Sequence, residues 1–301
     1  NRRGFAPYLI CKKCGYKLTC SNCSLYLTFH KFKNKAVCHH CSQEKSIKKN
    51  CKIENQCEFI MYGPGVEKIF EEVKEIFPDK TIEIFSSDYL KNKTEAEKLF
   101  EKINLNKVDI LVGTQMISKG FNFPKLNCIV VIDADFSGRG YDLRTTEKNI
   151  QLYHQLSGRA GRFSSKSLII YQTLTPHNIV LNELIKNNSE KLLDNELLLR
   201  EKNELPPFKR LIAIIISSQD RSLSLQGARE IKMKLRQINN LEVLGPVDSP
   251  LLKIKKKFRS RLLIRFNNPF LMQKKISNVL NGLKISSKIK LTVDVDPINF
   301  S

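Results

Sequence analysis

The sequence predicts an α/β fold in which a parallel-sheet lobe carries an inserted four-cysteine zinc-binding module and is followed by a small α+β domain. Three observations predict it. Apolar strand-like runs alternate with amphipathic helical patterns between residues 66 and 173, eight of the nine cysteines lie between residues 11 and 57, and residues 205–301 alternate strand and helix again. Strands that alternate with helices form a parallel sheet with helices on both faces. At 301 residues the chain is long enough for two domains.

The lobe is predicted from its hydrophobic periodicity. Residues 66–77 repeat apolar side chains at helical spacing, and Pro78 ends the pattern. "NCIVVIDAD" at 127–135 is typical of a buried strand that ends in carboxylates. The other predicted strands are 81–88, 108–114 and 167–173, and the other predicted helices are 94–104 and 145–160. Ligands of such sheets bind beyond the carboxyl ends of the strands, so chemistry is expected in the loops that follow them.

The clustered cysteines predict zinc sites rather than disulfides or a redox centre. A Cys-x-x-Cys pair lets two thiolates of one tight turn reach the same tetrahedral ion at about 2.3 Å, so each zinc needs two pairs. A redox Cys-x-x-Cys usually occurs once, inside a βαβ pattern. Four pairs therefore predict two Zn²⁺. The ligands are Cys11, Cys14, Cys20, Cys23, Cys38, Cys41, Cys51 and Cys57.

The order of the four pairs favours a nested arrangement. The second and third pairs close one site, and the first and fourth pairs close another around it. Metal binding then supplies most of the folding free energy of this short polar segment, on the order of 10 kcal/mol per site. Nearby histidines are expected outside both coordination shells because the cysteines suffice. They are His30, His39 and His40.

Positive charge is concentrated at the two ends of the chain. Lys and Arg number 51 against 30 Asp and Glu, a net charge of +21. Residues 1–58 carry +9, residues 59–204 carry −1, and residues 205–301 carry +13. Such ends favour a polyanionic partner. A lysine-rich composition with solvated basic faces is the alternative.

The sequence also indicates a location. The longest apolar runs fall well short of the roughly 18 residues of a membrane helix, and no signal peptide is recognisable. A cytoplasmic, nucleoid-associated location is expected, where thiols stay reduced. Asn1 in place of Met is typical of a segment of a longer chain.

Three loops lie where the predicted sheet would place chemistry. They are "GTQMISKGFNFP" (113–124), "DADFSGRGYDLR" (133–144) and "QLSGRAGR" (155–162). Arg159 and Arg162 have the spacing of guanidiniums that stabilise a phosphoryl group, and Gly158 lets the backbone come close. The alternative is a helix C-terminus, at which Arg satisfies carbonyls and Gly takes the left-handed cap.

These motifs together resemble a known family. "DILVGTQMISKGFNFPKLNCIVVIDAD" and "QLSGRAGR" resemble motifs V and VI of superfamily 2 helicases. The cysteines just before them narrow the resemblance to the PriA family of primosomal replication-restart helicases. "NRRGFAP" resembles its motif IV, "YGPGVEKI" its Gly-x-Gly-Thr-Glu segment, and "LPPF", "VLGPVDSP" and "VDVDP" its C-terminal landmarks. The resemblance covers essentially the whole chain and implies a RecA-like helicase lobe.

The resemblance implies roles for single residues. Arg159 and Arg162 would reach the ATP γ-phosphate across an interlobe cleft, with Gln155 near the same site. Residues implied to couple the nucleotide to DNA are Thr114, Gln115 and Gly120. A structural or DNA-facing role is implied for Asp142, Arg144 and Glu147.

The same resemblance shows departures. The sequence contains neither a Gly-x-x-x-x-Gly-Lys-Thr loop nor an Asp-Glu-x-His pair, which hold ATP and Mg²⁺ and belong to the first half of the family protein. Phe121 and Asn122 replace the usual His-Asp. Glu54 stands where the second cysteine of the fourth pair belongs, so Cys57 from a longer turn or a Glu54 carboxylate completes the outer site.

The C-terminal end carries a predicted nucleic-acid contact. "KIKKKFRSR" at 253–261 gathers six positive charges around an aromatic ring, a pattern that tracks phosphates and stacks on bases. A solvated hairpin tip is the alternative. The residues are Lys253, Lys255, Lys256, Lys257, Phe258, Arg259 and Arg261. The resemblance implies that this domain binds branched and single-stranded DNA and the acidic tail of single-stranded DNA-binding protein.

We therefore expect part of an ATP-dependent 3′-to-5′ DNA helicase that restarts stalled forks and loads primosome proteins. Without the lobe that binds ATP, this chain is expected to be inactive alone. A zinc-ribbon scaffold on DNA without a motor, and another superfamily 2 translocase, are the alternatives. The expected parts are the start of the lobe (1–10), the two-zinc insertion (11–58), the lobe (59–175), a connecting helix (176–204) and the C-terminal domain (205–301).

Overall fold

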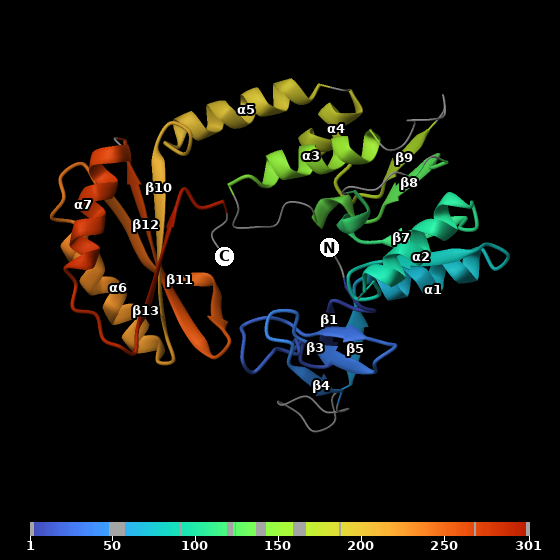
Figure 1. Cartoon of the computed structure of the whole chain (residues 1–301), viewed down its shortest axis with the longest axis horizontal. Coiled ribbons are helices and arrows are strands. Elements are labelled where there is room, and N and C mark those ends of the chain that lie inside the picture. Colours follow the sequence, from blue (N-terminus) through green and yellow to red (C-terminus); the bar gives the residue numbers. More distant parts are fainter. Residues whose placement is uncertain are drawn as a thin grey trace. The chain divides into compact units, whose positions relative to one another are not determined.

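A computed structural model gives the fold of the chain (Figure 1). It describes residues 3–47, 58–90, 92–118, 123, 125–136, 143–158, 167–186, 188–267 and 269–298. The chain divides into two compact units. The first holds Asn1–Ser21, Leu25–Ala134 and Leu152–Gln172, and the second holds Asn22–Ser24, Asp135–Gln151 and Thr173–Ser301.

The first unit contains the predicted parallel strands. β6 (Ile82–Phe85) pairs in parallel with β7 (Ile110–Gly113). Parallel strands need a long connection, and α2 (Lys93–Asn104) makes this crossover. β8 (Cys128–Val131) pairs in parallel with β9 (Leu168–Tyr171). Within the described residues the hydrogen bonds give two separate pairs rather than one continuous sheet.

The predicted strand at 127–135 is shorter and less buried than expected. β8 has four residues, and Val130 is 55% exposed. Ile170, in the partner strand β9, is 45% exposed. Side chains of a strand alternate between its two faces, so one face of this pair remains open in the described part of the chain. After β8 the chain enters a 3-10 turn, η2 (Ala134–Phe136).

Helix α1 (Val66–Ile76) forms where the apolar spacing predicts it. Its apolar face, which includes Val66 and Val73, packs against Ile84 of β6 and Val112 of β7. Burial of such a face is what stabilises a short helix, because helix propensity alone is too weak.

A close backbone approach fixes the start of this helix. Gly65 is its N-cap, and a Cβ there would lie 2.1 Å from the carbonyl oxygen of Gly4, so no larger residue fits. Gly65 N donates to Phe5 O, and Glu67 N donates to Gly4 O, both at 3.0 Å. The N-terminal segment therefore satisfies the N–H group of the N-cap and one free N–H group of the first helical turn.

The cysteine-rich insertion leaves the lobe and returns to it through one strand pair. β1 (Tyr8–Cys11) runs antiparallel to β5 (Phe59–Tyr62), so the two ends of the insertion lie side by side. Inside it, β2 (Thr28–His30), β3 (Lys35–Val37) and β4 (Glu44–Ser46) form an antiparallel meander.

The apolar core of the insertion is small, as the sequence predicts. Tyr26 is 44% exposed and Phe32 is 63% exposed, so neither contributes fully. Among the described residues of the insertion, the buried apolar side chains other than cysteine are Leu27, Phe29, Ala36 and Val37. A core of this size leaves room for metal ligands to stabilise the module.

Two helices stand where a single connecting helix is expected over 176–204. α4 (Ile179–Ile185) is capped by Asn178, whose Oδ1 accepts a hydrogen bond from Val180 N at 2.9 Å. α5 (Ser189–Lys202) follows after a break, with Asn188 at its N-cap. The Asn178 side chain thus satisfies one free N–H group of α4, whereas Asn188 makes no side-chain cap hydrogen bond at the start of α5.

Residues 210–267 and 269–298 form the predicted α+β domain. The chain order is β10 (Arg210–Ser218), α6 (Arg221–Leu235), β11 (Glu242–Ile254), β12 (Lys257–Phe266), α7 (Pro269–Asn281) and β13 (Lys290–Val295). Their sheet has the order β11-β12-β10-β13, and each neighbouring pair is antiparallel. Two βαβ halves thus interleave their strands.

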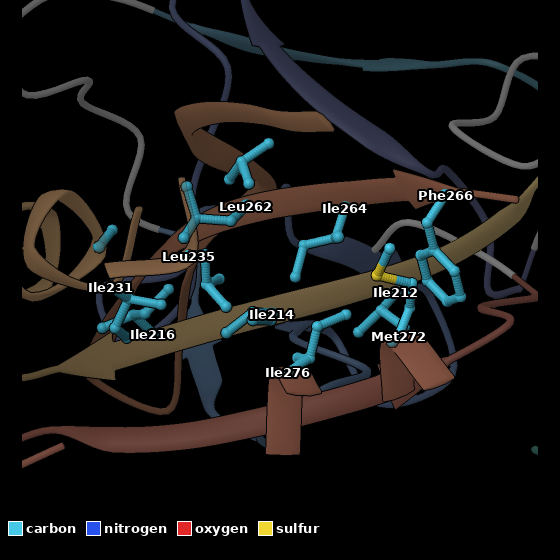
Figure 2. Close-up of a cluster of buried hydrophobic side chains, with 12 residues drawn as sticks. Ile212, Ile214, Ile216, Ile231, Leu235, Leu262, Ile264, Phe266, Met272 and Ile276 are labelled. Atoms are coloured by element: carbon cyan, nitrogen blue, oxygen red, sulfur yellow. The ribbon is translucent and has the colours of Figure 1, made fainter. Parts of the chain in front are cut away.

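One face of this sheet is covered by α6 and α7 (Figure 1). Figure 2 shows the core between the sheet and these two helices. Side chains from β10 and β12 contact side chains of α6 and α7 there. Ile214, Leu262 and Ile264 are fully buried there. Alternate residues of β10 and β12 supply this core, which is the period of two expected for a sheet covered on one face.

Asp220 sets the start of α6. The helix begins at Arg221, because the Asp220 carboxylate caps it by accepting a hydrogen bond from Ser222 N at 2.8 Å. β11 is a strand where none is expected. Gly245 and Pro246 are typical of a turn, but they lie at a register shift of this edge strand, where a bulge tolerates both residues.

None of the helices in the described part of the chain combines the length and the hydropathy that a bilayer crossing requires.

Candidate metal centre and candidate nucleotide site

Four cysteines of the insertion converge on one point. The Sγ atoms of Cys20, Cys23, Cys38 and Cys41 all lie within 4.8 Å of one another, and those of Cys20 and Cys41 are 3.5 Å apart. A tetrahedral zinc with Zn–S bonds of about 2.3 Å separates its sulfurs by about 3.8 Å. The cluster therefore fits one zinc ion, and it corresponds to the inner site of the nested arrangement.

Backbone turns hold each pair of sulfurs in place. Cys20 N donates to Leu25 O and Cys38 N donates to Gln43 O, both at 2.9 Å. Ser42 has φ +59°, a left-handed conformation that tightens the second turn. The Cys20 thiol donates to Gln43 Oε1 at 3.0 Å, a hydrogen bond that only the protonated sulfur can make.

The cluster is closed to solvent. Cys38 is 0% exposed and Cys23 is 1% exposed. Cys41 is partly exposed, but a catalytic zinc keeps a coordination position for water, whereas four thiolate ligands leave none. The arrangement is suited to a structural role, in which the ion stabilises the fold of the module.

The outer cysteines are described only in part. Cys14 N donates to Cys11 Sγ at 3.5 Å, which is the turn geometry that lets two thiolates share an ion. The β1–β5 register places Cys11 opposite Phe59, two residues after Cys57 in the sequence.

The first of the two predicted nucleotide-facing segments follows β7. Thr114 and Gln115 directly follow β7, at the carboxyl end of the parallel pair, and Gln115 begins the 3-10 turn η1 (Gln115–Ser118). Thr114 is half-buried and Gln115 is exposed. This is the edge at which parallel sheets bind ligands.

Close packing at this edge requires glycine. A Cβ on Gly113 would lie 2.4 Å from both Ile117 Cδ1 and Phe85 O. Thr114 N donates to Phe85 O at 3.3 Å, which continues the β6–β7 ladder into the loop. Gly113 thus lets the loop fold back over the ends of both strands.

The other predicted nucleotide-facing residues lie at the end of α3 (Thr145–Ser157). Gln155 is half-buried in its last turn, and Gly158 follows it, donating its N–H to His154 O at 2.9 Å. Tyr153 OH donates to Ala134 O at 3.1 Å, which fixes this end of the helix against the segment after β8.

Several predicted residues lie outside the described residues. They are Cys51, Glu54, Cys57, Gly120, Phe121, Asn122, Asp142, Arg159 and Arg162.

Asp135 holds together the segments that follow β8 and β9. Its carboxylate accepts hydrogen bonds from Thr173 Oγ1 and Leu174 N, both at 2.6 Å, and from Thr175 Oγ1. The bond from Thr173 and those from Thr175 and Leu174 lower the pKa of Asp135 to about 2. The sequence indicated carboxylates at this strand end but not their partners, which lie about forty residues away.

Glu147 has a structural partner. Its Oε1 lies 2.8 Å from Nη2 of Arg200, and the same guanidinium nitrogen donates to Leu143 O at 2.6 Å. Arg200 Nε also donates to Glu196 at 3.1 Å within α5. Arg200 therefore fastens α5 to the start of α3, and Glu147 takes part in this structural contact.

The basic C-terminal segment forms a hairpin. Lys253 lies on β11, Lys255 and Lys256 form the turn with positive φ, and residues 257–261 lie on β12. Phe258 and Arg259 are neighbours on one strand, so they point to opposite faces of the sheet. The alternation therefore divides the predicted stripe between two faces and a tip.

The basic residues on the two faces of the hairpin have different surroundings. Lys253 Nζ lies 5.2 Å from the centre of the Phe258 ring, a cation–π contact. Arg259 and Arg261 face the same side of the sheet as their β10 partners Ser217 and Ile215. Burial lowers the pKa of both guanidinium groups.

Comparison with known proteins agrees with each part of this fold. Residues 33–164 match the helicase conserved C-terminal domain. Residues 20–45 match the PriA DNA helicase Cys-rich region domain, and residues 201–298 match the primosomal protein N C-terminal domain. The chain thus combines a helicase C-terminal domain and a cysteine-rich region with a primosomal protein C-terminal domain.

Curated relatives match from end to end of the chain. Replication restart protein PriA of Rickettsia conorii is 37% identical over 302 residues, which is 100% of this chain and 46% of the relative. The protein of the same name from Haemophilus influenzae is 32% identical, over 100% of this chain and 42% of the relative. That from Bacillus subtilis is 29% identical, over 99% and 38%. The chain belongs to the PriA family of replication restart proteins, and it spans less than half the length of these relatives.

Proposed function

We propose that this chain is the C-terminal part of an ATP-dependent DNA helicase that moves 3′ to 5′ and restarts stalled replication forks by remodelling fork DNA and loading the primosome. The observation that carries the proposal is structural. The chain combines a four-cysteine cluster with a parallel strand pair whose carboxyl end presents Thr114 and Gln115. Family matches to all three parts of the chain support it.

The nucleotide site is shared with a second lobe. Arg159 and Arg162 supply positive charge to the γ-phosphate, and Gln155 lies on the same segment. Gly158 allows close approach there, while Thr114, Gln115 and Gly120 couple the nucleotide to the DNA. ATP and Mg²⁺ are held chiefly by the Gly-Lys-Thr loop and the Asp-Glu pair of the other lobe, motifs that this sequence does not contain. The isolated chain is therefore inactive as an ATPase.

Two zinc ions hold the insertion together. The inner ion takes Cys20, Cys23, Cys38 and Cys41, whose geometry fits it. The outer ion takes Cys11 and Cys14 with Cys51 and Cys57, and Glu54 is the alternative eighth ligand. The closed inner shell makes the module a structural platform, which suits a surface for primosome proteins.

The C-terminal domain grips DNA. The hairpin tip at Lys255 and Lys256 is exposed, and Phe258 with Lys253 offers a ring and a cation to a base and a phosphate. Arg259 and Arg261 add charge on the other face. Branched and single-stranded DNA and the acidic tail of single-stranded DNA-binding protein are the proposed partners, and the nucleoid is the proposed location.

DNA-stimulated ATP hydrolysis tests the proposal. The 301-residue chain alone should hydrolyse ATP at background rate, and the chain joined to the N-terminal half of its own protein should regain DNA-stimulated turnover. In the joined protein Arg159→Ala should lower turnover by about 10³-fold, the low end of what an arginine finger contributes. Arg229→Ala, an exposed arginine of α6, is the matched control and should leave turnover unchanged.

Two results would contradict the proposal. Appreciable turnover by the isolated chain would show that the nucleotide site is not shared. DNA binding with no ATPase activity in the joined protein would instead favour a scaffold that has lost its motor.

A further inference from the structure

A second cluster of metal-ligating side chains lies in the first unit, apart from the cysteines. His30 is the last residue of β2, His39 lies in the turn after β3, and Asp88 lies in the loop after β6. One ligand atom from each lies within 4.8 Å of the other two. We infer that His30, His39 and Asp88 form a third metal site, which takes a divalent transition-metal ion of the zinc class and joins the cysteine module to the helicase lobe.

The two imidazoles already have the spacing of metal ligands. Nε2 of His30 lies 3.1 Å from Nε2 of His39. Two nitrogens on a tetrahedral ion with bonds of about 2.05 Å are about 3.3 Å apart. A metal ion can therefore replace the proton that these two nitrogens share, with small movement of either ring.

A buried carboxylate orients the first ligand. Glu67 Oε1 lies 3.0 Å from Nδ1 of His30, and Glu67 is 2% exposed. Because a carboxylate accepts, His30 donates from Nδ1 and its Nε2 lone pair faces His39. Lys31 N donates to Glu67 Oε2 at 2.8 Å, which holds the carboxylate in place. This carboxylate–histidine arrangement is the usual support behind a metal-bound imidazole.

Asp88 offers an oxygen that needs a partner. Its Oδ2 is buried, and it accepts no hydrogen bond from the described residues. Nη1 of Arg3 lies 3.9 Å from the other oxygen, Oδ1. An unsatisfied buried carboxylate oxygen is costly, and a bound cation would remove that cost.

The ligand set points to the kind of ion. Two imidazoles and one carboxylate suit zinc, cobalt or nickel better than magnesium or calcium, which prefer oxygen alone. His39 is exposed, so a fourth position is open to water. The histidines come from the cysteine module and Asp88 from the lobe, so the ion would fasten one to the other.

Metal content of matched variants tests this site. The full 301-residue chain is dialysed against Zn²⁺ and against Co²⁺, and bound metal per chain is measured by elemental analysis. His39→Gln and Asp88→Asn should each bind one equivalent fewer than the unmodified chain. His40→Gln, the exposed neighbour in the same Cys-His-His-Cys turn, should bind the same amount. Glu67→Gln should bind the third equivalent 10- to 100-fold more weakly.

The cobalt spectrum separates this site from the thiolate sites and reports on folding. The thiolate-to-cobalt charge-transfer band should be unchanged in Asp88→Asn, while the weaker bands of a nitrogen and oxygen site disappear. If His39→Gln loses the thiolate band as well, its turn has been disturbed and Asp88→Asn decides the question. Equal metal content in the unmodified chain and in Asp88→Asn would overturn the inference and leave a histidine pair joined by a proton.

Discussion

Glu67 in the first turn of α1 lies 3.0 Å from Nδ1 of His30 at the end of β2, and both side chains are buried. The pair links two segments 37 residues apart, one from the lobe and one from the cysteine module. Glu67 also accepts from Lys31 N, so one carboxylate fixes both the ring and the backbone of the module. This contact positions the module on the lobe whether or not a metal ion lies beyond His30.

Removing that carboxylate should destabilise the first unit. Glu67→Ala leaves His30 Nδ1 and Lys31 N without their acceptor in a buried place, which costs about 1–3 kcal/mol. Thermal unfolding should show a lower Tm. Glu71→Ala is the control one turn later, because its bond to Lys31 Nζ is partly exposed and is worth about 0–1 kcal/mol. Equal effects of the two changes would contradict this assignment.

Loss of one inner thiolate should release metal. Cys38→Ser removes a fully buried ligand, and we expect one zinc equivalent to be lost together with the fold of the module. Cys128→Ser is the matched control, because Cys128 is exposed on β8 and outside the cluster. Zinc per chain and the near-ultraviolet circular dichroism spectrum measure both effects. A Cys38→Ser protein that keeps all of its zinc would rule out the inner site.

Acid should remove the contribution of Asp135. Its pKa is lowered from the ordinary 3.8 to about 2, chiefly by the hydrogen bond from Thr173, so the native state favours the ionised form. The stability that this group adds is fully present above about pH 4 and is lost as the pH falls through 2. The difference in free energy of unfolding between the unmodified chain and Asp135→Asn should therefore shrink from pH 5 to pH 2. A difference that is constant over this range would count against the hydrogen-bond network.

The C-terminal core should be sensitive to a cavity. Leu262 is 0% exposed in β12, and Leu262→Ala should cost about 2–5 kcal/mol in urea unfolding. Leu271 on α7 is 51% exposed, so Leu271→Ala should change stability by about 0.5 kcal/mol or less. Similar losses from both changes would mean that the domain does not pack as described.

Much of the fold follows from local signals. The helices at 66–77, 94–104 and 145–160 were predictable because their apolar residues recur at helical spacing, and each begins and ends within a few residues of its prediction. β11 was not predictable, since Gly245 and Pro246 are typical of a turn and only the neighbouring strand accommodates them. The break between α4 and α5 was missed because leucines continue through both segments.

The candidate sites also divide into those that local sequence spacing predicts and those that depend on distant segments. The spacing of Cys20, Cys23, Cys38 and Cys41 predicted their cluster because a metal ion demands a fixed ligand geometry that two short turns can supply. The partners of Asp135 and of Glu67 are 36 or more residues away in the sequence, and no spacing rule connects them.

The sequence by itself determined the class of fold, the zinc chemistry and the family, because periodicity, ligand spacing and motif order are local properties of the chain. Only the tertiary structure decided which faces the basic residues occupy, where the buried carboxylates find their partners, and that two histidines and an aspartate converge on one point. Those features depend on backbone register and packing between distant segments, where displacement by a single residue moves a side chain to the opposite face.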